Sequence, residues 1–305
     1  MSKIQSALRF FKEDRGAFMA AIVQNFFRWL PDKPYLQLLY RFKMGHRLNL
    51  KNPKTFTEKL QWLKLYNRRP EYTNMVDKYA VKKYVADIIG EEYIIPTLGV
   101  WDKPEEINWD SFPNQFVLKT THGGGGGGVV ICKDKQTFNR ADAIAKLNQS
   151  MRSDIYSGLR EWPYKNVPRR IIAEKFMAPK KSPAPADLPD YKFFCFDGKV
   201  KFFKIDFGRF VEHHANYYSP NGELLPFDEK GLEPDPNHVE VMPVNLSEMI
   251  AVAEKLSTGF KFLRVDLYNV KGKIYFGELT FYPASGLLSF VPEEADKTIG
   301  DYLGI

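Results

Sequence analysis

Cysteine is scarce in this chain, which excludes folds that depend on disulfides. Only two cysteines, Cys132 and Cys195, occur among 305 residues, too few for the disulfide framework of a small secreted domain. Both lie in apolar, strand-like runs, which predicts buried thiols. Because the five histidines show no paired Cys/His spacing, the sequence contains no recognisable zinc site.

Long apolar runs are also lacking. The most apolar early stretch, AFMAAIVQNFF, is interrupted by Gln24 and Asn25, whereas a membrane-spanning helix needs about 20 predominantly apolar residues. The charged stretch KEDRG follows the first basic turn, where a signal peptide would have its apolar segment. We therefore expect a cytoplasmic protein, either free or peripherally attached at the inner face of the membrane.

What the sequence does contain favours a folded protein with an anionic partner. Hydrophobic residues make up 44% and aromatic residues 15% of the chain, enough for a large core in one elaborated domain or a few subdomains. The net charge of +7 suggests a nucleotide, an acidic polysaccharide or an anionic membrane surface as the partner. No nucleic-acid partner is expected.

Helical patterns predominate in the first 90 residues. The stretch FTEKLQWLKLYN has apolar residues at helical spacing, and the nearby threonines with Glu58 supply a helix start. A second helix is predicted from near Thr73 to Gly90. We expect residues 1–75 to form an accessory helical region. The basic and aromatic residues of its first 50 positions would dock on the rest of the protein, the favoured alternative, or on a membrane surface.

After the second predicted helix, short β-branched and aromatic runs alternate with turn residues. The short turn sequences DGK and VKGK are each flanked by alternating apolar and polar residues, which predicts two antiparallel hairpins. Helices are expected at about 136–152 and 246–257. The pattern therefore predicts an α+β fold with antiparallel sheets.

Six consecutive glycines, Gly123 to Gly128, follow Lys119 and the sequence TTH. A flexible linker is one interpretation, since polyglycine is a random coil. The glycines lie between two strand-like segments, QFVLKTT and GVVICK, which favours a flap whose N–H groups wrap a phosphate chain. Neither a P-loop nor a G-x-G-x-x-G fingerprint fits, because both lead into a helix.

Two carboxylates, Asp266 and Glu278, fall on the two strands of the hairpin predicted around Lys271-Gly272. Their apolar neighbours indicate that both point to the same polar face. Facing carboxylates are costly unless a cation lies between them, and hard oxygen ligands suit Mg²⁺ carrying a nucleotide. Two solvated acids on an open sheet face are the alternative, which Lys119 and the glycines make less favoured.

Several ordered motifs resemble those of the TupA-like ATP-grasp proteins, which are named for teichuronopeptide synthesis and occur in bacterial polysaccharide loci. The motifs are NPKTFTEKLQWLKLY, VDKYAVKKYV, FVLKTTHG, EWPYKN, DYKFFCFDGK and RVDLYNVKGKIYFGELTFYP. The resemblance covers roughly residues 35–305 and implies an ATP-grasp fold, in which two α+β subdomains clasp ATP, with an N-terminal helical region. Residues 76–305 would be catalytic, with the flap and hinge at about 93–180 and the metal and acceptor sites at about 190–305.

The resemblance implies a nucleotide site. Lys78 and Lys119 would neutralise phosphate charge, and Glu174 with the backbone of Lys175 and Met177 would contact adenine. The flap contacts would come from Thr121, His122, Gly123, Gly124, Gly125 and Gly126.

The same resemblance implies a metal and phosphoryl site. Asp266 and Glu278 match the Mg²⁺ ligands, and Arg264 would steady the transferring phosphoryl group. Many ATP-grasp enzymes have an asparagine where this chain has Thr280, a weaker ligand, so water or substrate would help to hold a second metal ion.

A looser likeness to glutathione-synthetase-type enzymes adds further candidates. Lys192 and Arg209 would contact the transferred phosphate, with a structural salt bridge to Asp190 or Asp206 as the alternative. The segment that follows matches a substrate loop, although adjacent histidines in a turn are often ordinary surface residues. The candidate acceptor contacts are His213, His214 and Asn216.

The implied reaction is an ATP-dependent carboxylate-amine ligation with ATP and Mg²⁺ as cofactors. A uronic acid of an acidic glycan or lipid-linked saccharide would be activated as an acyl phosphate and captured by an amino acid or another amine donor. A kinase acting on a sugar hydroxyl and a glycosyltransferase are the alternatives. The glycosyltransferase is less favoured, because Asp235-Pro-Asn lacks the second acid of a D-x-D metal motif.

Overall fold

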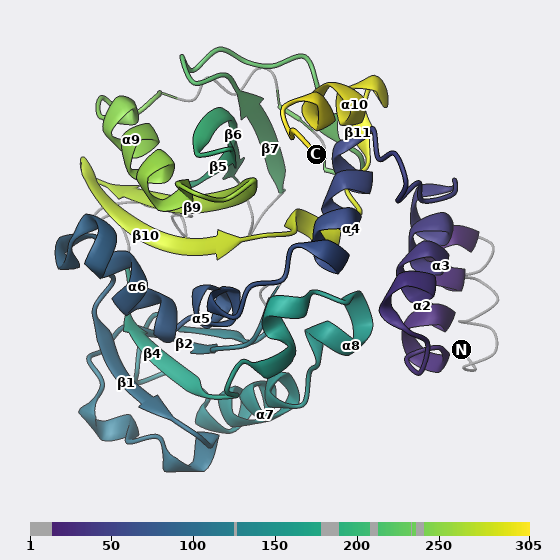
Figure 1. The fold of residues 1–305 in the computed structure, drawn as a ribbon. Helices are drawn as coiled ribbons and strands as arrows, with labels where there is room; N and C mark the ends of the chain where they lie inside the picture. The colour runs from purple at the N-terminus through teal and green to yellow at the C-terminus, as the bar shows by residue number, and fades with distance from the viewer. Residues whose placement is uncertain (1–13, 125–126, 178–188, 208–212, 233, 236–240) are drawn as a thin grey trace.

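The computed structural model describes residues 14–124, 127–177, 189–207, 213–232, 234–235 and 241–305. Within this part of the chain, two α+β lobes face each other and a pair of helices packs beside them (Figure 1). Each lobe is built on an antiparallel sheet. The predicted α+β fold with antiparallel sheets is therefore confirmed.

The first lobe contains a four-stranded sheet in the order β1-β4-β2-β3. Its elements are β1 (Thr97–Trp101), β2 (Phe116–Thr120), β3 (Val129–Cys132), β4 (Ile171–Lys175) and the covering helix α7 (Arg140–Met151). Along β2, Phe116 and Leu118 are buried in the core with α7, whereas Lys119 is half-buried on the opposite face. The two-residue period of a strand thus turns a charged side chain toward the second lobe.

The second lobe contains a five-stranded sheet in the order β10-β9-β5-β6-β7. Its elements are β5 (Asp190–Phe196), β6 (Lys199–Phe207), β7 (His214–Tyr218), β9 (Phe262–Val270), β10 (Lys273–Thr280) and helix α9 (Leu246–Ser257). Both predicted hairpins are present. Asp197-Gly198 and Lys271-Gly272 turn with positive φ at both residues, the geometry of a two-residue type I′ turn.

Helix α4 (Phe56–Tyr66) starts as the sequence predicts. The Thr55 hydroxyl accepts a hydrogen bond from the backbone N–H of Glu58, and the Glu58 carboxylate accepts one from the backbone of Thr55. This capping box satisfies two amides at the helix start. Phe56 then packs against the rings of Phe196 and Phe262, so the helix is fastened to the second lobe.

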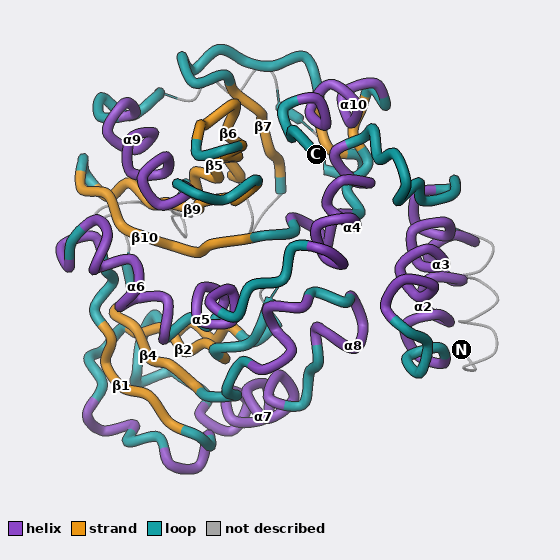
Figure 2. Tube along the Cα trace, viewed as in Figure 1, coloured by secondary structure: helices purple, strands orange, loops and turns teal. Residues whose placement is uncertain are grey.

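The single helix predicted from Thr73 to Gly90 is wrong, because the chain forms two helices there. Helices α5 (Glu71–Val76) and α6 (Ala80–Ile89) lie between the two sheets (Figure 2). Asp77 adopts an extended backbone, and its Oδ1 accepts hydrogen bonds from the N–H groups of the next helix start. An aspartate that bonds its neighbouring backbone competes with helix continuation. The break leaves Lys78 in the link between the helices.

The N-terminal helices α2 (Arg15–Phe26) and α3 (Asp32–Met44) pack on each other and on the rest of the protein. Leu159 and Leu287 contact the cluster between them. The Arg160 guanidinium lies 4.0 Å from the Tyr35 ring centroid and donates hydrogen bonds to the backbone after α2. Helices α2 and α3 therefore dock on the protein itself, while residues 1–13, which carry several of the basic and aromatic residues of the prediction, lie outside the described part of the chain.

Shorter elements connect these parts. They are η1 (Glu91–Tyr93), η2 (Pro104–Glu106), η3 (Trp109–Ser111), α8 (Ile155–Leu159), η4 (Trp162–Asn166), β8 (Asp228–Glu229), η5 (Pro283–Gly286), β11 (Phe290–Val291) and α10 (Glu294–Asp301). No helix in the described part of the chain has the length and apolar character that crossing a bilayer requires.

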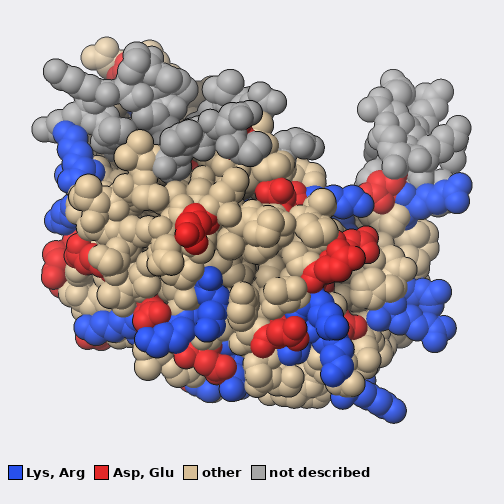
Figure 3. All heavy atoms as spheres, turned by 90° about the horizontal axis from the view of Figure 1, so that it is seen from above, with Lys and Arg blue, Asp and Glu red and all other residues tan. Residues whose placement is uncertain are grey.

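Phe26 and Trp29 are 73% and 75% exposed at the end of α2. We nevertheless expect wild-type protein to sediment equally with and without anionic vesicles. Acidic and basic side chains are interspersed on the face shown in Figure 3, and stable attachment needs more apolar area than two aromatic rings supply. Vesicle sedimentation that disappears in the Phe26→Ser, Trp29→Ser double variant would contradict this expectation.

Candidate active site

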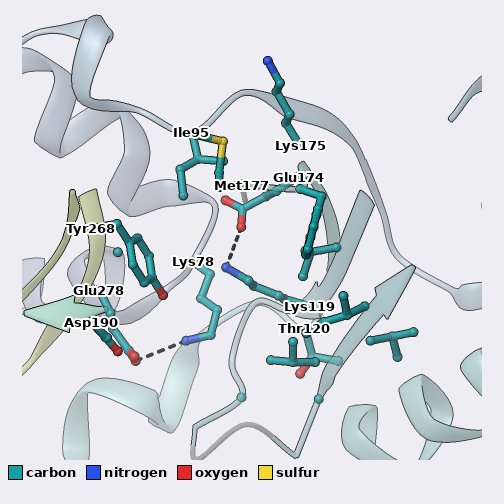
Figure 4. A pocket seen from close by; sticks show the side chains of 18 of the residues that line it. Lys78, Ile95, Lys119, Thr120, Glu174, Lys175, Met177, Asp190, Tyr268 and Glu278 are labelled. Carbon is teal, nitrogen blue, oxygen red and sulfur yellow. Dashed lines mark hydrogen bonds and ion pairs between the residues drawn. The ribbon is translucent and has the colours of Figure 1, made fainter. Parts of the chain in front are cut away.

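A cavity of about 830 Å³ lies between the two lobes (Figure 4). The first lobe contributes residues of β2, β3, β4 and α7, and the second contributes residues of β5, β9 and β10. The link between α5 and α6 forms another part of the wall through Lys78. The volume falls within the range of about 300–1,000 Å³ typical of small-molecule sites.

Many residues that the sequence analysis assigned to the nucleotide and metal line this cavity. They are Lys78, Lys119, Gly123, Gly124, Glu174, Lys175, Met177, Asp266 and Glu278. The side chain of Lys175 points away from the other labelled residues (Figure 4), which leaves its backbone as the part that meets the cavity. Gly125 and Gly126 lie outside the described residues.

Glu174 is held between two lysines. Its carboxylate lies 2.6 Å from Lys119 Nζ and 2.5 Å from Lys82 Nζ. Burial raises the pKa of Glu174, but the two ammonium groups outweigh this effect and lower the pKa to about 2. The side chain is therefore ionised at neutral pH and orients Lys119 in the cavity.

Lys82 is a cavity residue that the sequence analysis missed. Besides Glu174, its ammonium reaches the backbone oxygen of Ile95 at 2.6 Å. The adjacent Lys83 is 83% exposed and pairs with Asp87 one helical turn away. Helical periodicity separates the two lysines by about 100°, but without the position of β4 it does not say which one faces a partner.

Asp266 and Glu278 lie directly opposite each other on β9 and β10. A β-bulge at Gly277 creates this pairing, since the register shifts between Phe276 and Glu278. A Cβ at Gly277 would lie 3.0 Å from the backbone oxygen of Asp266 and 3.1 Å from the Tyr268 ring. Glycine at the bulge thus lets the two strands approach closely enough to hold the carboxylates side by side.

Each carboxylate of this pair also has a cationic partner. Lys78 Nζ lies 3.1 Å from Glu278, while Arg264 donates two hydrogen bonds of 2.7 Å to Asp266. Burial raises the pKa of Glu278, but Lys78 and Arg264 lower it overall. For Asp266, burial and the Asp190 carboxylate outweigh Arg264 and raise the pKa to about 6.

The donor chemistry of this wall fits Mg²⁺. Asp266 and Glu278 lie opposite each other in the cavity lining, to which Asp190 also contributes, and carboxylate oxygens are the ligands that Mg²⁺ prefers in nucleotide sites. Among the described residues, no three acidic, histidine or cysteine side chains lie close enough together to hold a metal ion, so phosphate oxygens and water would complete the coordination of an ion at the Asp266/Glu278 pair. The pKa of Asp266 is raised mainly by burial and to a smaller extent by Asp190, and a divalent cation would offset the repulsion from Asp190. Asp190 was absent from the predicted metal ligands, because its pairing beside β9 depends on the sheet order.

Two of the predicted site residues, Thr121 and Thr280, do not line the cavity. The Thr121 carbonyl accepts a hydrogen bond of 3.0 Å from the backbone of Lys78, and its hydroxyl bonds the segment before β4. Thr121 therefore fixes the link that carries Lys78. Thr280 accepts a hydrogen bond of 3.0 Å from Arg264, which places its hydroxyl beside the guanidinium.

Lys192 forms the salt bridges that the sequence analysis offered as its alternative role. Its ammonium lies 2.5 Å from both Asp190 and Asp206. It pairs in register with Asp266, one strand away from the predicted metal site. Arg209, its companion in the prediction, lies outside the described residues.

The predicted acceptor residues do not lie together against the cavity. His213 Nε2 lies 3.0 Å from Asp206, and His214 stacks on Phe207 with ring centroids 5.8 Å apart. Asn216 is buried, with side-chain hydrogen bonds to both backbone groups of Asp235. These contacts give Asn216 a structural role.

Gly123 and Gly128, the first and last glycines of the run, both lie close to the side chain of Thr120. A Cβ at Gly128 would clash with the hydroxyls of Thr120 and Ser150, which hydrogen-bond each other at 2.7 Å. We expect Gly128→Ala to lower the free energy of unfolding by about 1–3 kcal/mol, the usual cost of overpacking. Gly127→Ala, where a Cβ meets nothing within 4 Å, is the matched control and should be nearly neutral. Equal urea denaturation midpoints for the two variants would contradict this.

Comparison with known proteins supplies the family. The family model described as TupA-like ATPgrasp matches residues 58–304. A comparison with curated proteins found no match.

The solved structures that this chain is similar to are distant in sequence. A D-alanine-D-alanine ligase from Helicobacter pylori is 15% identical with a TM-score of 0.44, over 82% of this chain and 69% of that one. The corresponding ligase from Bacillus anthracis complexed with ATP is 17% identical with a TM-score of 0.42, over 75% and 63%. The ATP-grasp ligase PsnB, with a phosphomimetic variant of its minimal precursor, Mg and ADP, is 12% identical with a TM-score of 0.42, over 93% and 71%. The TupA-like ATPgrasp family model covers most of the 305 residues of the present chain. The chain therefore belongs to the TupA-like ATP-grasp family.

Proposed function

We propose that the protein is an ATP-dependent ligase that activates a carboxylate as an acyl phosphate and joins it to an amine. The observation that carries this proposal is one cavity that unites Lys78, Lys119, the glycine-run ends and the Asp266/Glu278 pair. This set combines cations for phosphates with carboxylates for a divalent metal. It contains the groups that phosphoryl transfer from ATP requires.

A carboxylate is a poor electrophile, because an oxide would have to leave. Transfer of the γ-phosphoryl group of ATP converts that oxygen into part of a phosphate leaving group, which an amine then displaces. Bound Mg²⁺ would neutralise charge on the phosphates. Lys119, held by Glu174 at 2.6 Å, is a fixed cation of the cavity wall for the same charge. Arg264 is not one of the lining residues and would act through Asp266, to which it donates two hydrogen bonds.

The acceptor that we favour is a uronic acid of a surface polysaccharide or its lipid-linked precursor, with an amino acid or an amino sugar as the amine. Membership in the TupA-like family and the net charge of +7 support an acidic glycan. A cytoplasmic site of action, with ATP and Mg²⁺ as cofactors, belongs to the same proposal.

Trapping the activated carboxylate tests the reaction type. With ATP, Mg²⁺, a uronic acid and hydroxylamine, a ligase should release ADP and phosphate and yield a hydroxamate, because the acyl phosphate is an activated carbonyl. A kinase would instead leave the phosphorus in a stable phosphoester. Detection of that ³¹P signal, with neither free phosphate nor hydroxamate, would overturn the proposal.

A further inference from the structure

A second cavity of about 310 Å³ lies beside the start of the glycine run. His122 contributes one wall, and the segments around α8 and η4 contribute the others. Its volume is at the lower end of the range of about 300–1,000 Å³ for small-molecule sites. The space suits a single sugar-sized molecule better than a nucleotide.

His122 is 4% exposed, and neither of its ring nitrogens makes a hydrogen bond of good geometry to the described part of the chain. The Ser150 backbone is close enough to act on the ring as a weak hydrogen-bonding group. Burial and Arg169 lower the pKa of His122, against smaller opposing effects of the Ser150 backbone and of two aspartates. The ring is therefore neutral at neutral pH, with one nitrogen able to donate and the other to accept. Buried polar groups normally have partners, so a ligand hydroxyl at this wall would complete its hydrogen bonding.

Positive charge predominates among the other polar lining residues. Lys165 and Arg169 form no ion pair within the described residues, where Arg169 donates to the Met151 carbonyl at 3.0 Å. Asp154 is the acid that lines this cavity, and both of its oxygens accept hydrogen bonds from Ser157. Burial raises the pKa of Asp154, but hydrogen bonds from Ser157 and, to a smaller extent, the charge of Arg169 lower it overall, so Arg169 has one acidic neighbour in this cavity. The two cations still outnumber the single acid of the lining, which favours a ligand that carries a carboxylate.

The second cavity adjoins the nucleotide cavity. A Cβ at Gly124, which lines the first cavity, would lie 3.3 Å from Ile155, which lines the second. Tyr164 lines the second cavity, and the carboxylates of Glu278 and Asp266 both raise its pKa after the larger effect of burial. The second cavity is thus close to both the flap and the predicted metal pair.

We propose that this second cavity binds an acidic sugar unit of the acceptor, with Lys165 and Arg169 attracting its carboxylate and His122 bonding a hydroxyl. This inference rests on the proposed function and assigns its acceptor site. The N-terminal helices support the site, since Tyr156 on α8 donates hydrogen bonds of 3.0 and 3.1 Å to Asp32 at the start of α3.

Calorimetric titration of the full chain with sodium D-glucuronate, in the presence of Mg²⁺ and a non-hydrolysable ATP analogue, tests the inference. We expect glucuronate to bind at least about fivefold more tightly than glucose, because glucose lacks the carboxylate. The Lys165→Met, Arg169→Gln double variant should bind glucuronate at least about tenfold more weakly. Both side chains are exposed, so the fold should be retained. Lys297→Met, an exposed lysine on α10, is the control and should match wild type.

The nucleotide titration of the same proteins separates the two hypotheses. Failure of wild type to bind the ATP analogue would count against the proposed function. Normal nucleotide affinity, with glucuronate bound equally by wild type and the double variant or by neither, would overturn the acceptor site alone. Loss of glucuronate binding with unchanged nucleotide affinity is the result that we expect.

Discussion

Replacing Lys119 with alanine is expected to remove most of the thermal stabilisation that Mg²⁺-ATP gives the wild-type protein. A ligand at 100 times its Kd stabilises a fold by about 2.7 kcal/mol. A charge-assisted hydrogen bond contributes about 1.5–3 kcal/mol, so at the same ATP concentration the stabilisation should fall to between about 0.3 and 1.3 kcal/mol. The ammonium lies in the cavity wall, 2.6 Å from Glu174, with no other role that the described contacts show.

Differential scanning fluorimetry with and without Mg²⁺-ATP measures this effect. Lys83→Ala is the matched control, because Lys83 is 83% exposed and faces Asp87 instead of the cavity. Lys119→Ala should still fold, since Lys82 remains 2.5 Å from Glu174. An undiminished shift in Lys119→Ala, or no shift in wild type at saturating ATP, would remove Lys119 from the nucleotide site.

The pairing of Asp266 with Glu278 shows how much of the site the sequence could predict. The polar pattern placed both carboxylates on one face, and the structure puts them opposite each other. The tight turn at Lys271-Gly272 by itself would have paired Glu278 with Val265, which points to the other face. The bulge at Gly277 corrects the register by one residue, and a lone glycine in a strand is only a weak indication of a bulge.

Other parts of the site depend on contacts between distant segments. Asp77 interrupts a strongly helical pattern because its Oδ2 accepts a hydrogen bond of 2.7 Å from Arg170, 93 residues away, while its Oδ1 caps α6. Without this break, Lys78 would lie on a continuous helix. Which of the two adjacent lysines, Lys82 or Lys83, lines the cavity depends in the same way on a distant partner, Glu174 of β4. Local propensity contains no information about such partners.

Replacing Glu278 with glutamine is expected to lower kcat by at least about 10²-fold, the usual cost of removing one charged or hydrogen-bonding group from a transition-state site. The amide preserves the shape of the side chain but removes a charge that Lys78 and Arg264 keep ionised. A neutral amide is a poorer ligand for Mg²⁺ than a carboxylate. The variant should therefore also need more Mg²⁺ to reach half of its own maximal rate.

Phosphate release from ATP, measured over a Mg²⁺ titration, distinguishes this effect from unfolding. Glu278→Gln should unfold near the wild-type temperature without ligand, because Lys78 is only partly buried, at 19% exposure, and can be solvated when its partner is neutral. Glu91→Gln, the same change at an exposed acid of η1, should leave both the rate and its Mg²⁺ dependence unchanged. If Glu278→Gln kept the wild-type rate and Mg²⁺ requirement, Asp266 and Asp190 would have to hold the metal ion without it, and the cross-strand pair would not be the metal site.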